Sequence, residues 1–149
     1  MTAASGESSS GCVFCDALGR NDPLILYRGT HCFVILNLYP YNNGHLMVVP
    51  LRHIARLADA RPEELSELMA LTRTAEMALA EAYAPHGLNM GLNLGKPAGA
   101  GVLDHLHIHV VPRWNGDTNF MPVVGQTRVL PELLEETDAR LRPRFEEAG

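Results

Sequence analysis

The sequence lacks the features of several common protein classes. None of its apolar runs approaches the ~20 residues that a membrane helix needs, so we expect no membrane partner. It also has no basic surplus, because 12 Lys+Arg stand against 17 Asp+Glu and give a net charge of −5. General nucleic-acid binders usually carry such a surplus, so we expect no nucleic-acid partner. A small phosphorylated ligand is compatible with this charge, since a few local donors can hold one phosphate.

Cysteine is scarce, and its arrangement is informative. Cys12, Cys15 and Cys32 form an odd set with one close pair. This is not a disulfide framework, and it indicates a reducing compartment, the cytoplasm, with a metal or redox role for the pair. Residues 1–11 show neither the basic nor the apolar segment of a secretory signal, so we expect a disordered leader. Residues 12–149 have the length and composition of one globular domain.

Apolar runs and turn residues alternate along the chain in a way that predicts five strands and two helices. The turn residues at 39–44 lie between two apolar runs and predict an antiparallel hairpin. Pro62, followed by two glutamates, begins a long helix with an apolar face, which ends before Pro85. Strands grouped around one long helix are typical of an α+β domain with a mainly antiparallel sheet of about five strands. The expected strands are 24–27, 32–38, 46–49, 88–94 and 106–111, and the expected C-terminal helix is 132–141.

Three of the seven histidines fall within five residues, at His105, His107 and His109. On a strand, alternate residues face the same side, so the three imidazoles share one face while Leu106 and Ile108 fill the core behind them. At a rise of ~3.3 Å per residue, neighbouring histidines are about 7 Å apart and the outer two about 13 Å apart. Two adjacent rings can therefore flank one phosphate group, whereas three cannot easily share one metal ion.

Clustered imidazoles are poor core material and suit catalysis or metal binding. Two kinds of chemistry fit the pattern. In the first, a neutral imidazole, with its other ring nitrogen held as N–H, attacks phosphorus and forms a covalent intermediate. In the second, His107 and His109 hold a catalytic zinc ion with a third ligand from elsewhere and an open water position. No acidic residue of the His-Glu-x-x-His type is nearby, which counts against the second.

A glycine-rich segment, residues 93–101, leads into the histidine strand. Its glycines let backbone N–H groups wrap an anion, and it contains Lys96, the only lysine of the chain. The spacing is not that of a Walker A loop, because Pro97 stands where that loop needs Ser or Thr. The segment is either a phosphate cradle or an ordinary turn. Arg113, directly after the strand, either neutralises phosphate charge or lies on the surface.

The segment 105–111, His-Leu-His-Ile-His-Val-Val, resembles the signature of the histidine triad superfamily of nucleotide hydrolases and transferases. The resemblance covers most of the chain. It includes the Cys-x-x-Cys start, the hairpin over residues 37–50, the long helix and the Asn-Leu-Gly at 93–95. It implies the HIT-like α+β fold with an antiparallel sheet, usually assembled as a homodimer.

The same resemblance implies roles for individual residues. His107 would be the nucleophile that attacks the α-phosphorus of a nucleotide. His109 would hydrogen-bond the phosphoryl oxygens and assist the leaving group, and His45 matches the upstream active-site histidine. Asn37 matches the polar residue that contacts the ribose. The other implied nucleotide-binding residues are Asn93, which faces the phosphate site, and Gly101 of the glycine-rich segment.

Two features of the sequence bear on the substrate. Many relatives carry Gln-Ser or Gln-Thr where this chain has Gly101-Val102, which weakens the case for an adenosine phosphoramidase. The stretch 111–120 is more similar to the dinucleoside polyphosphate branch, which contains both hydrolases and diadenosine tetraphosphate phosphorylases. We therefore expect a nucleotidyl hydrolase or transferase that cleaves dinucleoside polyphosphates, with water or inorganic phosphate as acceptor. A nucleotide sensor without turnover is the non-enzymatic alternative.

The cysteine pair has the spacing of half a zinc site. Cys12 and Cys15 need two more ligands, and two histidines would complete a Cys2His2 set. A thioredoxin-like redox pair fits less well, because no βαβ pattern surrounds it. Several bacterial and archaeal histidine triad proteins resemble this arrangement, which implies that His53 and His105 complete a structural zinc site. The nucleotidyl transfer itself needs no catalytic metal, although the substrate can arrive as a magnesium complex.

Overall fold

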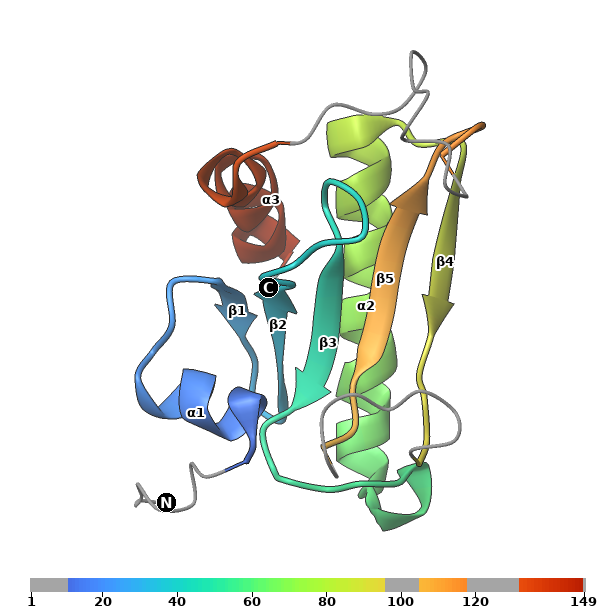
Figure 1. The fold of residues 1–149 in the computed structure, drawn as a ribbon. Helices are drawn as coiled ribbons and strands as arrows, with labels where there is room; N and C mark the ends of the chain where they lie inside the picture. Colours follow the sequence, from blue (N-terminus) through green and yellow to red (C-terminus); the bar gives the residue numbers. More distant parts are fainter. Residues whose placement is uncertain (1–10, 96–104, 118–131, 149) are drawn as a thin grey trace.

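The computed structural model describes residues 11–95, 105–117 and 132–148. Five strands form one antiparallel sheet in the order β1-β2-β3-β5-β4, with helices on both faces (Figure 1). This confirms the predicted α+β class, the five strands, the long helix and the C-terminal helix. The strands are β1 (Ile25–Arg28), β2 (Cys32–Leu36), β3 (Leu46–Pro50), β4 (Gly87–Gly91) and β5 (Ile108–Arg113); the helices are α1 (Val13–Gly19), α2 (Pro62–Tyr83), α3 (Leu134–Ala148) and the short 3-10 helix η2 (Leu57–Asp59).

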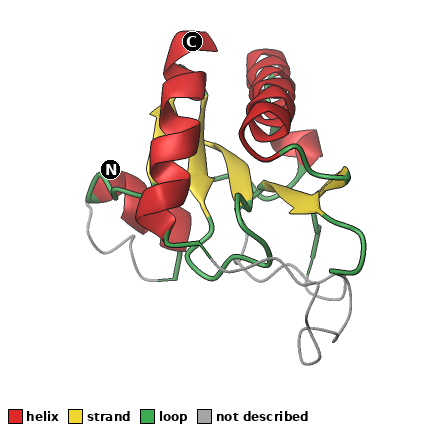
Figure 2. Cartoon of the chain, turned by 90° about the horizontal axis from the view of Figure 1, so that it is seen from above, coloured by secondary structure: helices red, strands yellow, loops and turns green. Residues whose placement is uncertain are grey.

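The alternation of side chains along the strands divides the interior into two clusters. On β3, Leu46 packs in the cluster beneath α2 and α3, whereas its neighbour Met47 packs in the cluster beneath α1. Figure 2 shows α2 and α3 on the same side of the sheet. On β5, Ile108 joins the cluster of α2 and α3. His107 therefore faces α1, where its ring lies 5.0 Å from that of Phe14, so the predicted alternation of the histidines with core residues is confirmed.

Helix α1 was not expected from the sequence. It has seven residues, which is too short for an apolar period to stand out. Its N-terminus is capped by Cys12, whose Sγ accepts a hydrogen bond from the backbone N–H of Cys15 at 3.3 Å. Phe14 and Ala17, each 2% exposed, attach the helix to the sheet. The Cys-x-x-Cys motif is thus the first turn of a helix that covers the histidine face.

The predicted ends of the five strands and of the C-terminal helix were wrong by one to seven residues, and β2 ends two residues early, at Leu36. β5 begins two residues later than expected and continues through Pro112, where β4 pairs with it but β3 does not. Proline is tolerated there because only one flank of the strand is bonded. β4 ends at Gly91, three residues early. α3 runs past Pro143 to Ala148, because Phe145 is buried in the core. No described helix combines the length and hydrophobicity needed to cross a membrane.

Candidate active site

His107 lies just before β5 and faces α1, with only 4% of its surface exposed. Its Nδ1 is 2.8 Å from the backbone oxygen of His105. A carbonyl oxygen can only accept, so Nδ1 carries the proton and Nε2 keeps its lone pair. Burial lowers the pKa of His107, although the hydrogen bond to His105 opposes this. The ring is therefore a neutral imidazole with one nitrogen held as N–H, as attack on phosphorus requires.

His109 and His45 are hydrogen-bonded to each other, and their ring protons lie on Nε2 rather than on Nδ1 as in His107. The backbone N–H of Tyr41 donates to His45 Nδ1 at 3.0 Å, so the proton of the neutral His45 ring lies on Nε2. That nitrogen is 3.0 Å from His109 Nδ1, which therefore accepts. The proton of His109 then lies on its own Nε2, where it can be donated. Burial, followed by the charge of His109, lowers the pKa of His45 to about 4.

The two reactive rings lie side by side. The centroids of His107 and His109 are 4.8 Å apart, closer than the spacing of their positions on the strand. One ring presents a lone pair at Nε2 and the other presents an N–H. This combination suits a phosphoryl group, which needs a nucleophile at phosphorus and a donor at oxygen.

Asn37, at the end of β2, lies next to this pair. Its Oδ1 accepts from the backbone N–H of Tyr39 at 3.0 Å, and its Nδ2 is 3.3 Å from His45 Nε2. With the His45 proton on Nε2, both of these nitrogens carry hydrogen, so this contact is not a hydrogen bond. The side chain also lines the cavity in front of the histidines. The structure thus brings Asn37, His45, His107 and His109 together, as the sequence predicted for one site.

A cavity of about 940 Å³ opens in front of His107 and His109. This is within the size range of small-molecule sites, about 300–1,000 Å³. Its wall is mostly apolar, and its outer rim carries Glu135 and Asp138 of α3. Sequence reasoning missed this contribution of α1 and α3, since the long separation of those segments gives no local signal. The apolar wall includes Val13, Phe14, Ala17, Leu24, Ile35 and Met47.

A second cluster, outside this cavity, has the chemistry of a metal site. It consists of Cys12, Cys15, His53 and His105, whose four ligand atoms lie within 4.8 Å of one another. The Nδ1 atoms of the two histidines are 3.1 Å apart. His105 Nδ1 lies 3.3 Å from Cys12 Sγ and 3.7 Å from Cys15 Sγ, and His53 Nδ1 lies 3.4 Å from Cys15 Sγ.

These separations fit one tetrahedral zinc ion. Zinc–nitrogen and zinc–sulfur bonds of normal length place two nitrogens about 3.4 Å apart and a nitrogen and a sulfur about 3.6 Å apart. His105 Nε2 donates to the backbone oxygen of Pro50 at 2.9 Å, which leaves Nδ1 as the free lone pair directed at the cluster. Burial and the neighbouring Cys12 raise the pKa of the Cys15 thiol to about 12, and a bound metal would deprotonate it.

The metal cluster and the reactive histidines share two contacts. The Phe14 ring lies 5.3 Å from that of His105 and 5.0 Å from that of His107. The backbone oxygen of His105 also holds His107 Nδ1. The first histidine of the run therefore faces the metal cluster with its side chain and orients the second histidine with its backbone.

Four other residues singled out from the sequence have different outcomes. Asn93 is exposed, two residues beyond β4, and continuing the register of Gly91 with His109 would bring it level with His107. Lys96 and Gly101 lie outside the described residues, so their roles stay predictions. Arg113 is not simply a surface residue, because its guanidinium forms a bidentate ion pair with Asp117. Its neutralisation of phosphate charge stays a prediction.

Comparisons with known proteins agree with this geometry. The HIT domain family model matches residues 19–116. The AP-4-A phosphorylase of Mycobacterium tuberculosis is 48% identical over 120 residues, which are 80% of this chain and 62% of that protein. The chain thus spans less than two thirds of that relative's length. An uncharacterized HIT-like protein of Saccharolobus solfataricus is 31% identical over 130 residues, covering 84% of this chain and 93% of that protein.

The solved structures include a Zn-bound histidine triad family protein from Mycobacterium smegmatis. It is 32% identical, covers 96% of this chain and 97% of its own, and has a TM-score of 0.75. A histidine triad nucleotide-binding protein from Sulfolobus tokodaii is 28% identical, with a TM-score of 0.73 and coverage of 91% and 93%. The family match spans most of the chain and contains the hairpin histidine and the histidine run, so the chain belongs to the HIT domain family.

Proposed function

We propose that the protein is a nucleotidyl hydrolase or transferase that cleaves dinucleoside polyphosphates through a covalent nucleotidyl-His107 intermediate. The observation that carries this proposal is the fixed tautomer of His107. Its Nδ1–H is donated to the His105 backbone at 2.8 Å, which leaves Nε2 as a lone pair beside a cavity of nucleotide size. The family membership and the 48% identity to an AP-4-A phosphorylase support the substrate class.

The chemistry divides into two displacements at the α-phosphorus. In the first, His107 Nε2 forms a bond to phosphorus as the bond from phosphorus to the bridging oxygen breaks. His109 donates its Nε2–H to the phosphoryl or leaving oxygen, and the backbone oxygen of His105 stabilises the charge that develops on the His107 ring. In the second, an acceptor oxygen bonds to phosphorus and the bond to His107 breaks. His109 keeps its Nε2–H in both steps and acts as a hydrogen-bond donor, a phosphate acceptor attacks through an unprotonated oxygen, and a water acceptor releases its proton to solvent.

The geometry favours this route over a zinc-dependent hydrolase built on the same two histidines. His107 has a free lone pair at Nε2, but His109 has none, because its Nδ1 accepts from His45 and its Nε2 carries the proton. The Cys and His side chains that converge as metal ligands among the described residues are those of the separate cluster. A zinc ion there would hold α1 against the sheet and would not contact the phosphoryl group.

The acceptor is tested directly by incubating the protein with diadenosine tetraphosphate, with and without inorganic phosphate. The similarity to an AP-4-A phosphorylase favours phosphate as acceptor, which would yield ADP and ATP only when phosphate is added. AMP and ATP formed without phosphate would identify a hydrolase. Binding of the dinucleotide without any product would contradict the enzyme and support the nucleotide sensor.

We propose a structural zinc ion at the cluster of Cys12, Cys15, His53 and His105. The support is the tetrahedral fit of the ligand atoms and the similarity to a 32% identical, Zn-bound histidine triad family protein. Thiolate ligands and the free thiols of the described cysteines also support the reducing cytoplasm as the setting. Elemental analysis should find one zinc per chain, and Cys15→Ser should abolish binding. Full occupancy in that variant would contradict the assignment.

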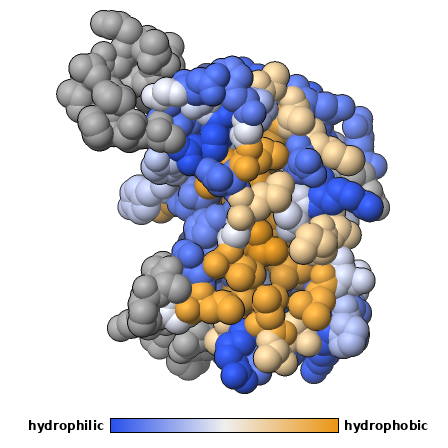
Figure 3. All heavy atoms as spheres, turned by 90° about the vertical axis from the view of Figure 1, so that its right-hand side faces the viewer, coloured by the Kyte–Doolittle hydropathy of each residue, from blue (hydrophilic) through white to orange (hydrophobic). Residues whose placement is uncertain are grey.

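We also propose that the protein is a homodimer formed through β4 and the adjacent side of α2. β4 is an edge of the sheet, and an edge can pair with its own copy across a two-fold axis. Exposed Met90 and Leu94 lie on or just after β4. Exposed Leu65 and Met69 lie on the side of α2 that also carries Tyr83, whose ring packs against Trp114 just after β5. Figure 3 shows apolar atoms gathered on this face of the molecule. Light scattering should give twice the chain mass, and Met90→Glu should give a monomer.

A further inference from the structure

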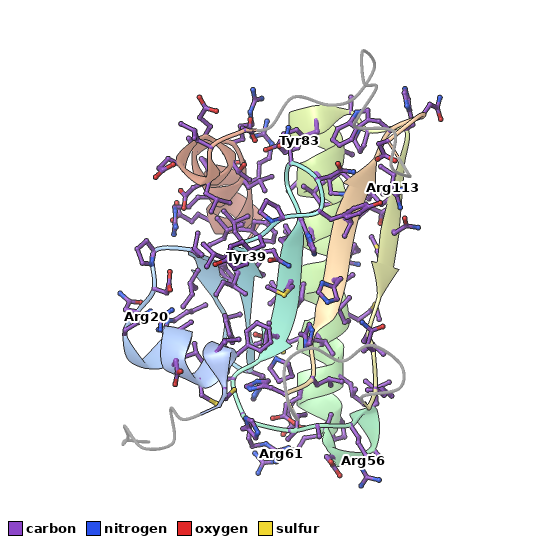
Figure 4. The ribbon with its side chains drawn as sticks, in the orientation of Figure 1. Arg20, Tyr39, Arg56, Arg61, Tyr83 and Arg113 are labelled. Carbon is purple, nitrogen blue, oxygen red and sulfur yellow. The ribbon has the colours of Figure 1, made fainter. Side chains whose placement is uncertain are left out.

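The far end of β5 carries an ion pair that the proposed chemistry does not use. Asp117 has only 4% of its side chain exposed. Arg113 donates hydrogen bonds to its carboxylate from Nη2 at 2.9 Å and from Nε at 3.2 Å. The backbone N–H of Trp114 also donates to Asp117 Oδ2 at 2.9 Å. The hydrogen bonds from Arg113 are the main cause that lowers the pKa of Asp117. Figure 4 shows Arg113 at this end of the sheet, near Tyr83 of α2.

The same carboxylate reaches across to the turn between β2 and β3, residues 37–45. Asn42 of that turn donates its Nδ2 to Asp117 Oδ2 at 2.7 Å and to the backbone oxygen of Pro112 at 2.9 Å. The Arg113 guanidinium lies 5.2 Å from the centre of the Tyr41 ring. Two consecutive residues of the turn are therefore held by the Arg113–Asp117 pair.

The turn is held on its other side as well. Gly44 has φ +85, and a Cβ on it would lie 3.0 Å from Leu79 and 3.1 Å from Tyr83 of α2. The turn is thus packed between α2 and the end of β5, with a backbone conformation that other residues rarely adopt. Such packing leaves its backbone N–H groups little freedom of direction.

One of those N–H groups sets the protonation pattern of the active site. Tyr41 N–H donates to His45 Nδ1 at 3.0 Å, and the backbone N–H of His45 donates to the Asn42 oxygen at 3.1 Å. Because His45 Nε2 must then carry the proton, His109 must accept at Nδ1 and donate from Nε2. Asn37 Nδ2, 3.3 Å from His45 Nε2, would favour the opposite tautomer, so the shorter hydrogen bond from Tyr41 N–H decides whether His109 presents a donor or an acceptor to the phosphoryl group.

We propose that Asp117 is a positioning residue: by binding Asn42 and Arg113, it fixes the turn so that Tyr41 N–H holds His45 and His109 in their Nε2–H tautomers. Asp117 touches neither reactive histidine and acts through the turn. The consequence for turnover rests on the proposed function, whereas the tautomers themselves can be observed without any substrate.

The test uses two variants of the whole chain. Asp117→Asn removes the negative charge that pairs with Arg113. Asn42→Ala removes the hydrogen bond between Asp117 and the turn while leaving the ion pair in place. Two-bond proton–nitrogen correlation spectra of protein labelled with ¹⁵N-histidine report which ring nitrogen of each histidine carries the proton. We expect wild-type His45 and His109 to be Nε2–H and His107 to be Nδ1–H. Both variants should lose the single tautomer of His45 and His109 and keep that of His107.

Turnover of diadenosine tetraphosphate gives the second readout. A misdirected donor should lower kcat by about 10- to 100-fold with little change in KM, because binding contacts remain. Glu67→Gln is the matched control, since Glu67 Oε2 anchors a different turn through the backbone N–H groups of His31 and Cys32 at 3.0 and 2.9 Å. This control should keep both tautomers and kcat.

The outcomes separate the two proposals. Unchanged His45 and His109 tautomers in the variants would overturn the positioning role, as would the same tautomer loss in Glu67→Gln. If Asp117→Asn does not fold, Asn42→Ala carries the test alone. Lost tautomers with wild-type turnover would support the positioning role and contradict the donor role of His109 in the proposed function.

Discussion

Replacing His45 by glutamine should remove a specific part of the pH dependence of stability. His45 is 7% exposed, and its Nδ1 faces the N–H of Tyr41, so a second proton would set two N–H groups against each other. Burial, and then the charge of His109, lower its pKa from 6.5 to about 4. Between these two values the unfolded chain binds more protons than the folded chain, so stability falls as the pH falls from 7 to 4.

The size of the effect follows from the two pKa values. A histidine that titrates near 6.5 when unfolded and near 4 when folded lowers the free energy of unfolding by about 2 kcal/mol between pH 7 and pH 5. Below about pH 4 both states are protonated at this site, and it adds no further loss. The loss belongs to the His45 ring and should disappear with it.

Urea unfolding of the wild type and of His45→Gln at pH 7 and pH 5 measures this loss. The wild type should lose about 2 kcal/mol more than the variant over that interval. His31→Gln serves as the control for removing a histidine from outside the site. If His45→Gln loses stability as steeply as the wild type, the buried, neutral His45 is refuted, and with it the tautomer assigned to His109.

Two further predictions concern the metal cluster and the aromatic ring beside it. Removing zinc with a chelator should lower the melting temperature, while the protein that remains folded should continue to cleave diadenosine tetraphosphate. Immediate loss of cleavage without unfolding would instead indicate that a metal ion takes part in the reaction. Phe14→Ala should cost about 3–5 kcal/mol in a urea titration, because the ring is 2% exposed. The same variant should bind zinc less tightly, since Phe14 packs on His105; unchanged zinc affinity would contradict that coupling.

The histidine face was predictable because a strand has a period of two. His107 and His109 had to share a side, and Ile108 had to point into the core. An error of one or two residues in the ends of the strand does not change this. The long helix was equally clear, since Pro62 and the acids after it mark a helix start. Patterns of this kind depend on neighbouring residues alone, so one sequence contains them.

The features of the site that could not be predicted from the sequence depend on contacts between distant segments. The tautomer of His45 is set by a backbone N–H in a turn, and that turn is fixed by Asp117, 75 residues after Asn42. The cavity wall combines α1 with α3, which lie at opposite ends of the described chain. Neither arrangement leaves a local pattern. The family resemblance did anticipate that Cys12, Cys15, His53 and His105 come together, because it carries their positions together, and their binding of zinc stays a prediction.

The central claim, that His107 bonds directly to phosphorus, is tested most directly by trapping the intermediate. The protein is mixed with diadenosine tetraphosphate labelled at the α-phosphorus, quenched in base during turnover and digested for mass spectrometry. We expect an acid-labile AMP adduct on the peptide that contains His107, and no adduct in His107→Gln. Turnover without any adduct on that peptide, or an equal adduct in the variant, would contradict it.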